Sequence, residues 1–442
     1  MYLWLGIRDN MQKNVIVGLC AVIVVAVVVV AGIAVFLNKD KDDFKLPEYQ
    51  KDTGTVYGNA DGNCYIDSTD KKVMQKIIDG DASLEDYPFA DANLDGVVNE
   101  KDIEIVDKYM DKESVTLKVL DAEDKVINVA YPIDKIILLC GSNLAPLINI
   151  LDISDKVVAA AYTSEKFNDI RDYPIAKGVK DGTIMQVSTK GTADDFAKIA
   201  SLDLKACHFM MTEYSSMYDL DSDENVTKLN DMGIDVLRME ARDPGQDLRS
   251  MAVFGILLNK GDAAKEYQDF INNVHKQIDD ALGDKKGKVG VMISSLTSNL
   301  SGQSSGYTVM LETAGGYNMA DWNESTKKVT EGDTWFLDPK YASNILFLGS
   351  SSDYGGTGFK AADDTKYENL YKDHHAYTDG KVYRYSTGIP VICRIAYYAE
   401  AMNPDCFSEN WAHNIHQQFV DKFFKTEYTV NDEIFFKLFN TA

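Results

Sequence analysis

The sequence is poor in basic residues. It holds 45 Lys and Arg against 69 Asp and Glu, which gives a formal net charge of −24 at neutral pH. Because proteins that bind nucleic acids need a basic surface, an acidic excess of this size argues against a nucleic-acid partner. It suits an extracellular face or a calcium-rich setting. A chain of 442 residues, 45% of them hydrophobic, is long enough for two to four domains with cores of their own.

Cysteine and histidine are also few, with six of each. The cysteines include no C-x-x-C pair, so neither a zinc motif nor a disulfide framework is indicated. Cys140 and Cys207 fall in apolar segments, where they are expected to be small core residues. The pair at 374–375 lies in a charged loop, and His413 and His416 share a helical face. No histidine cluster for zinc or manganese is visible, and no G-x-S-x-G motif of a serine hydrolase occurs.

One long uncharged run stands near the amino terminus. Residues 15–37 are rich in Val, Ile, Leu and Ala, and their 23 positions are enough to span a bilayer. No convincing small-residue cleavage motif follows, and Cys20 has a poor lipobox context. We therefore predict an uncleaved single-pass anchor in residues 1–37 and a polar linker in 38–56. The bulk of the chain is expected to be extracytoplasmic, at the cell membrane.

Residues 57–113 contain a twelve-residue pattern twice, 32 residues apart. Oxygen-bearing side chains stand at loop positions 1, 3, 5, 9 and 12, and a backbone carbonyl at position 7 completes a set suited to calcium. A helix is predicted after each loop, and Ile66 and Val98 are expected to pack between the loops. The predicted ligands are Asn59, Asp61, Asn63, Tyr65, Asp67 and Asp70 in the first loop, and Asp91, Asn93, Asp95, Val97, Asn99 and Asp102 in the second.

This segment resembles the dockerin domain, whose loops end in Asp and whose repeats lack the entering helix of a full EF-hand. Asn59 replaces the first acid and Cys64 stands where a turn glycine is usual, so the first loop is expected to bind calcium more weakly. A calcium-stiffened spacer and a pair of acidic turns without metal stay open as alternatives. The resemblance implies a cohesin partner that faces loop positions 10 and 11, here Ser68, Thr69, Glu100 and Lys101.

From residue 115 onward, apolar strands alternate with helices. After a hairpin in 115–129, strands are predicted at 136–140, 157–161, 206–210 and 235–239, and again at 288–293, 345–348 and 381–385. Such alternation implies parallel sheets with right-handed crossovers.

Between the two sets, residues 246–259 and 262–283 read as helices. The longer one has an apolar stripe, Asp262 as its N-cap and Gly283 as its stop. The predicted fold class is α/β, with Rossmann-like lobes in 114–245 and 284–442 joined by interlobe helices in 246–283.

Residues 115–442 resemble the ABC-transporter solute-binding proteins that capture iron–siderophore complexes, haem and cobalamin. The likeness lies in the order and spacing of the segments 132–137, 151–158, 246–283 and 398–407. It implies two lobes around a ligand, a fairly rigid connecting helix, delivery to an ABC permease, and no catalysis. An acid near Asp194 and Asp195 docks onto the permease in this family. Thr192 and Asp195 also form a capping box, which we favour.

Ligands of open α/β sheets bind beyond the carboxyl ends of the strands. Aromatic side chains there would suit a flat chelate or macrocycle, and an arginine would suit a carboxylate. The predicted ligand-binding residues are Ser142, Asn143, Tyr162, Met211, Tyr214, Trp335, Tyr354, Tyr385 and Arg394. Core packing is the alternative for each aromatic residue, and a local acid is the alternative partner of Arg394.

The predicted function is a membrane-anchored solute-binding protein for an iron complex (siderophore or haem) or a corrinoid. The alternatives are a dockerin-bearing surface enzyme or carbohydrate-active subunit, and an adhesion module scaffolded through the calcium loops.

Overall fold

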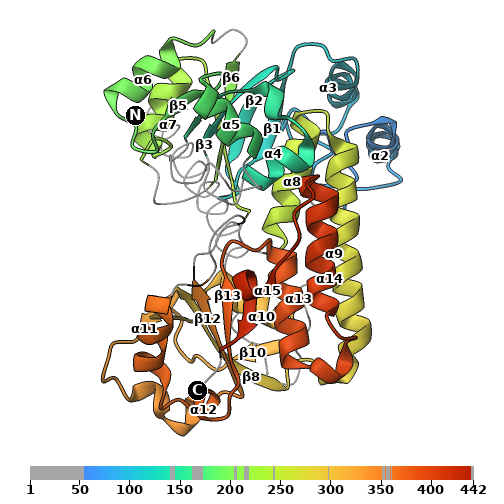
Figure 1. The fold of residues 1–442 in the computed structure, drawn as a ribbon. Coiled ribbons are helices and arrows are strands. Elements are labelled where there is room, and N and C mark those ends of the chain that lie inside the picture. The colour runs from blue at the N-terminus through green and yellow to red at the C-terminus, as the bar shows by residue number, and fades with distance from the viewer. Residues whose placement is uncertain are drawn as a thin grey trace, which may run out of the picture. The chain divides into compact units, whose positions relative to one another are not determined.

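A computed structural model gives the fold of the chain (Figure 1). It describes residues 54–139, 145–161, 173–203, 207–213, 219–241, 244–296, 298–350 and 361–439, together with Tyr354 and Phe359. The segment from Tyr49 to Ala442 is one compact unit. Within the described ranges, no helix combines the length and the apolar character needed to cross a bilayer. The predicted anchor in 15–37 lies outside these ranges.

Residues 57–113 form two loop–helix units, as the repeated pattern predicts. Helix α2 spans Ser68–Ile78 and α3 spans Glu100–Met110. The last acids of the two loops, Asp70 and Asp102, are also the third residues of the following helices. Each closes a capping box with the N-cap residue of its helix, which is Asp67 for α2 and Asn99 for α3. Ile66 and Val98 are buried, in agreement with the prediction that they pack inside the module.

The first lobe is built on a parallel sheet of five strands, with a hairpin before it. The hairpin consists of β1 (Val115–Leu120) and β2 (Val126–Tyr131). The sheet has the order β5-β4-β3-β6-β7, with β3 at Lys135–Leu139, β4 at Val157–Ala161, β5 at Met185–Val187, β6 at Cys207–Glu213 and β7 at Asp235–Met239. The connections contain α4 (Ala145–Leu151), η1 (Ser154–Lys156), α5 (Tyr173–Asp181), α6 (Ala193–Ala200) and α7 (Asp223–Asp231).

Two consecutive helices follow the first lobe. Helix α8 (Gln246–Leu257) is buried around almost its whole circumference, and α9 (Gly261–Leu282) runs on for 22 residues and leads through η3 (Gly283–Lys285) into the second lobe. The predicted long helix is therefore present, and Tyr267, Ile271, Val274 and Ile278 of its apolar stripe are buried. The predicted N-cap is wrong: α9 starts one residue earlier, Lys260 occupies the cap, and Asp262 lies in the first turn.

The second lobe has a mixed sheet of seven strands in the order β11-β9-β8-β12-β13-β14, with β10 beside β8. Its centre is parallel, as predicted, but β9, β11 and β14 pair antiparallel at its edges. The prediction of a purely parallel sheet was therefore wrong there. The strands are β8 (Val289–Leu296), β9 (Asn299–Ser301), β10 (Gly316–Asn318), β11 (Thr326–Lys328), β12 (Ile345–Ser350), β13 (Val382–Ser386) and β14 (Phe436–Leu438).

The helices of this lobe pack on its sheet and on α9. Helix α13 contacts both α9 and α14, and Figure 1 shows these three lying side by side. Helix α13 begins at Val391, so Arg394 lies in its first turn. The helices are α10 (Gly306–Thr313), η4 (Trp335–Leu337), η5 (Pro339–Tyr341), α11 (Ala361–Tyr371), α12 (His375–Thr378), α13 (Val391–Met402), η6 (Pro404–Cys406), α14 (Trp411–Phe419), the π-helical turn η7 (Val420–Phe424) and α15 (Asp432–Phe435).

Candidate functional site

The strand order of the first sheet reverses beside β3, between β3 and β6. In open sheets of this kind, ligands bind at that point, beyond the carboxyl ends of the strands. The segments that follow β3, β4 and β6, at 140–144, 162–172 and 214–218, lie outside the described residues. Four predicted ligand residues fall there: Ser142, Asn143, Tyr162 and Tyr214. Met211 belongs to β6, but nothing is described of its side chain.

A small cavity of about 40 Å³ lies where elements of both lobes meet. The first lobe contributes Leu147 of α4, the interlobe helix α8 contributes Asp247, and the second lobe contributes the turn between β13 and α13 with Arg394. Tyr267 of α9 completes the polar part of the lining. The cavity therefore brings the predicted Arg394 together with two polar residues, Asp247 and Tyr267, that were not predicted to line a site.

Arg394 has an unusual environment for an arginine. The residue is only 3% exposed, and its Nε atom has no hydrogen-bond partner. Its guanidinium lies 5.6 Å from the ring centre of Tyr307, and no carboxylate forms an ion pair with it in the described part of the chain. A buried cation without a counter-charge is costly unless another group supplies the charge. Arg394 therefore gives this small cavity a positive charge.

Asp247 lines the same cavity but is held by its own surroundings. Its carboxylate accepts hydrogen bonds from Tyr267 Oη at 2.9 Å and from the backbone N–H groups of Gly245 at 3.1 Å and Leu248 at 2.9 Å. Burial raises the pKa of Asp247 to about 6 in spite of these bonds. Sequence reasoning missed Asp247; the one signal it carried was an acid in the first turn of an otherwise apolar helix.

The structure places three other predicted ligand residues away from this cavity. Tyr385 is fully buried and donates to the backbone oxygen of Ser294 at 2.9 Å. Tyr354 is 1% exposed and packs among His416, Phe424, Tyr428 and Phe435. Trp335 is partly buried against the hydrophobic core of the second lobe, and the Lys327 ammonium stands 3.9 Å from its ring centre.

The capping interpretation of Thr192 and Asp195 is confirmed. Asp195 is 2% exposed and accepts hydrogen bonds from the backbone and hydroxyl groups of both Thr192 and Ser188. Although burial opposes it, this set of bonds lowers the pKa of Asp195 to about 2. Asp194 is exposed and pairs with Lys198 at 2.9 Å.

The two loops of residues 57–113 bury polar oxygen atoms, and one of these atoms has no hydrogen-bond partner. Asn59 is fully buried, and its Oδ1 atom accepts no hydrogen bond. Asp70 and Asp102 are fully buried too. Burial, together with neighbouring carboxylates, raises the pKa of Asp102 and raises that of Asp70 to about 7. The oxygen-bearing side chains of these loops are of the type that calcium prefers. In the described ranges, however, no group of three or more His, Cys, Asp or Glu side chains is arranged to hold a metal ion.

Neither a protein-family model nor a curated protein matches the chain. Solved structures do. The TroA-like periplasmic binding protein FepB from Veillonella parvula matches with a TM-score of 0.56 at 15% identity, over 73% of this chain and 99% of that one. The chain has the fold of the TroA-like periplasmic binding proteins.

Two further structures agree with this fold. The molybdate periplasmic binding protein MolA of an ABC transporter from Haemophilus influenzae, bound to molybdate, matches with a TM-score of 0.52 at 15% identity, over 70% of this chain and 98% of that one. CeuE from Helicobacter pylori, in a nickel–histidine complex, matches with a TM-score of 0.51 at 16% identity, over 72% and 98%. FepB and MolA are both periplasmic binding proteins. Each of the three matches leaves more than a quarter of this chain uncovered.

Proposed function

We propose that the protein is an extracytoplasmic solute-binding protein of an ABC importer. Its ligand is an iron complex (a siderophore or haem) or a corrinoid, which it delivers to a permease without transforming it. The fold supports the class of protein. The single observation that supports an anionic ligand is Arg394, a buried cation that lines a small cavity between the lobes and pairs with no carboxylate of the described residues.

A screen that compares anionic with neutral ligands tests this proposal. Thermal shift and absorbance would be measured with ferric siderophores, haem and cobalamins, using the full chain in detergent. An anionic chelate should raise the melting temperature, and Arg394→Gln should weaken its binding about tenfold or more, because a charge-assisted contact is lost. Binding of a neutral ligand should change much less. If no compound in the screen shifts the melting temperature, the proposed ligand class is wrong.

We also propose that the two loops bind calcium. Asn59, Asp61, Asn63, Asp67, Asp70 and the carbonyl of Tyr65 would hold one ion, and Asp91, Asn93, Asp95, Asn99, Asp102 and the carbonyl of Val97 the other. The bound ions would neutralise the loop carboxylates and fix the loops. Calorimetric titration should find two sites in the wild type and one in Asp102→Asn. Absence of heat at millimolar calcium would contradict this proposal.

Two further parts of the proposed function concern partners. Residues 15–37 would anchor the protein in the membrane, so the chain should stay with membranes through a high-salt wash; recovery of a soluble form that begins near residue 38 would contradict the uncleaved anchor.

The residues at loop positions 10 and 11 are exposed, namely Ser68, Thr69, Glu100 and Lys101. They therefore stay available to a cohesin, which remains a prediction of the dockerin resemblance.

A further inference from the structure

The first calcium loop lies directly against the start of α9. Gly261 is the first residue of that helix, and a Cβ atom built on it would stand 2.6 Å from the ring of Tyr65 and 2.7 Å from the backbone oxygen of Cys64. No side chain fits at such distances, so this close approach requires glycine. The contact joins residues that lie about 200 positions apart in the sequence.

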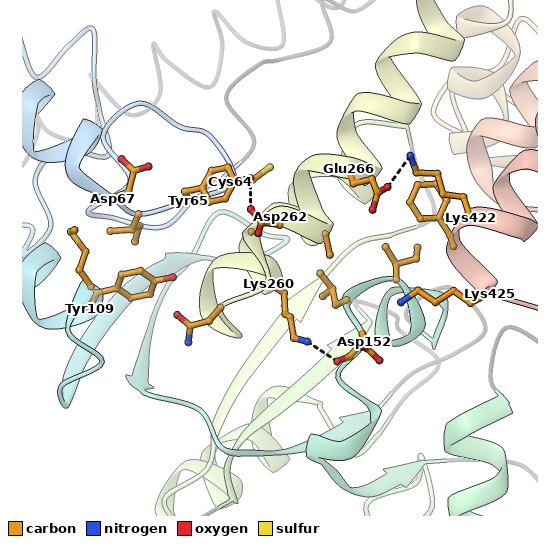
Figure 2. A pocket seen from close by; sticks show the side chains of 18 residues that line it. Cys64, Tyr65, Asp67, Tyr109, Asp152, Lys260, Asp262, Glu266, Lys422 and Lys425 are labelled. Atoms are coloured by element: carbon orange, nitrogen blue, oxygen red, sulfur yellow. Dashed lines mark hydrogen bonds and ion pairs between the residues drawn. The ribbon is translucent and has the colours of Figure 1, made fainter.

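Side chains extend this contact along α9 (Figure 2). Tyr65 donates a hydrogen bond to the carboxylate of Asp262 at 3.1 Å, and the Sγ atom of Cys64 donates to Gln268 Oε1 at 3.5 Å. Cys64 is 2% exposed. It stands at the loop position where a turn glycine is usual, and this departure now has a physical reason: its side chain fills the junction with α9.

The rest of the module is fixed to the same part of the molecule. The Tyr109 hydroxyl of α3 donates to the backbone oxygen of Ile256 in α8 at 2.7 Å, in a buried position. Before the first loop, Val56 pairs with Val119 of β1, and Arg249 of α8 donates to the Thr55 hydroxyl. Residues 54–56, predicted to belong to a linker, therefore join the fold, and the module is part of the same compact unit as the lobes.

The second loop has no comparable contact in the described structure. Val97 is 61% exposed and Leu94 is 38% exposed. A Cβ atom built on Gly96, which occupies the position equivalent to Cys64, would meet nothing within 4 Å. The two loops share a pattern of oxygen side chains, but only the first is packed against an interlobe helix.

We propose that cation binding in the first loop is coupled to the stability of the two lobes through α9, and that binding in the second loop is not. This inference rests on the proposed binding of calcium. Without a cation, Asp61, Asp67 and Asp70 repel one another, and the loop that carries Cys64 and Tyr65 loosens. The start of α9 then loses its support. Tyr267, in the second turn of α9, lines the cavity of Arg394, so the coupling reaches the proposed ligand site.

Tryptophan fluorescence can measure this coupling, because of the four tryptophans only Trp4 lies outside residues 284–442. In the full chain in detergent with Trp4→Phe, the signal comes from Trp322, Trp335 and Trp411, and therefore from the second lobe. Saturating calcium should raise the midpoint of its thermal unfolding by about 3 °C. Asp102→Asn should keep this rise, and Asp70→Asn, the same change at the equivalent loop position, should abolish it.

A substitution outside the loops provides the reciprocal test. Gly261→Ala improves the helix propensity of α9 but pushes Tyr65 and the Cys64 carbonyl away. Because coupling is reciprocal, Gly261→Ala should weaken calcium binding in the first loop about fivefold or more and leave calcium binding in the second loop unchanged. Equal behaviour of Asp70→Asn and Asp102→Asn, or unchanged affinity in Gly261→Ala, overturns the coupling while calcium binding stands. Absence of any calcium binding overturns both proposals.

Discussion

Replacing Arg394 by Met should stabilise the protein while it weakens the binding of an anionic ligand. Arg394 is 3% exposed, and none of the described carboxylates forms an ion pair with it. Removing a cation from water costs several kcal/mol, and the face of Tyr307 at 5.6 Å returns only about 0.5–2 kcal/mol. Methionine has a similar length and no charge, so the substitution should raise the free energy of unfolding by about 1–3 kcal/mol. A residue kept for packing alone would show the opposite sign.

Arg384 provides a matched control in the same lobe. It is fully buried as well, but it pairs with Asp364 and donates to the Ser350 hydroxyl at 3.1 Å, with its guanidinium between the rings of Phe359 and Tyr367. Arg384→Met should therefore lower the free energy of unfolding, by about 1–3 kcal/mol because Asp364 is partly exposed. Urea denaturation followed by tryptophan fluorescence measures both variants. Equal destabilisation of the two would refute the reasoning on Arg394.

Three further predictions concern stability. Burial lowers the pKa of His275 and His416 to about 3 and that of His374 to about 4, below the unfolded value near 6.5. Their contribution to the free energy of unfolding is therefore present above pH 6.5 and is lost as the pH falls. The loss should reach about 2 kcal/mol for each at pH 5. Because the raised pKa values of Asp70 and Asp247 act in the opposite direction over this range, the test compares the wild type with His416→Phe, and an equal change in urea midpoint between pH 7 and pH 5 in the two would contradict it. Tyr109→Phe should cost about 1 kcal/mol, because the buried hydrogen bond to the carbonyl of Ile256 is lost while that carbonyl keeps the backbone N–H of Asn259 as a donor; a value near zero in the same assay would contradict this. Asp195→Ala should cost about 2 kcal/mol through loss of the capping box, whereas Asp194→Ala should change stability by less than about 0.5 kcal/mol; thermal melting that moves equally in both would refute the assignment of the cap.

The elements that the sequence predicts well are those whose pattern repeats over many residues. The apolar stripe of α9 and the two loop–helix repeats repeat often enough for local pattern to identify them. Strands of three residues such as β9, β11 and β14 carry no readable period. The edges of the second sheet were therefore predicted wrongly.

The site was predictable only in part, because its members come from distant segments. Arg394 was predicted from its place after a strand and lines the cavity. Tyr385 was predicted in the same way, but it lies near the end of β13 and is buried in the core. Strand sequence does not tell which face a tyrosine covers when both faces are buried. The docking of residues 54–113 on α8 and α9 joins positions 147 or more apart, as in the bond from Tyr109 to Ile256. No local pattern announces such contacts.

The bond from Tyr109 to Ile256 also has a consequence for biosynthesis. Its two residues are separated by 147 positions, and chains grow at about 5–20 residues per second, so Tyr109 is made roughly 7–30 s before its acceptor. During that time the side of the module that carries Cys64 and Tyr109 has nothing to cover it. The amino-terminal module of this chain is thus made first and completed late, and it must be held soluble until α8 and α9 arrive.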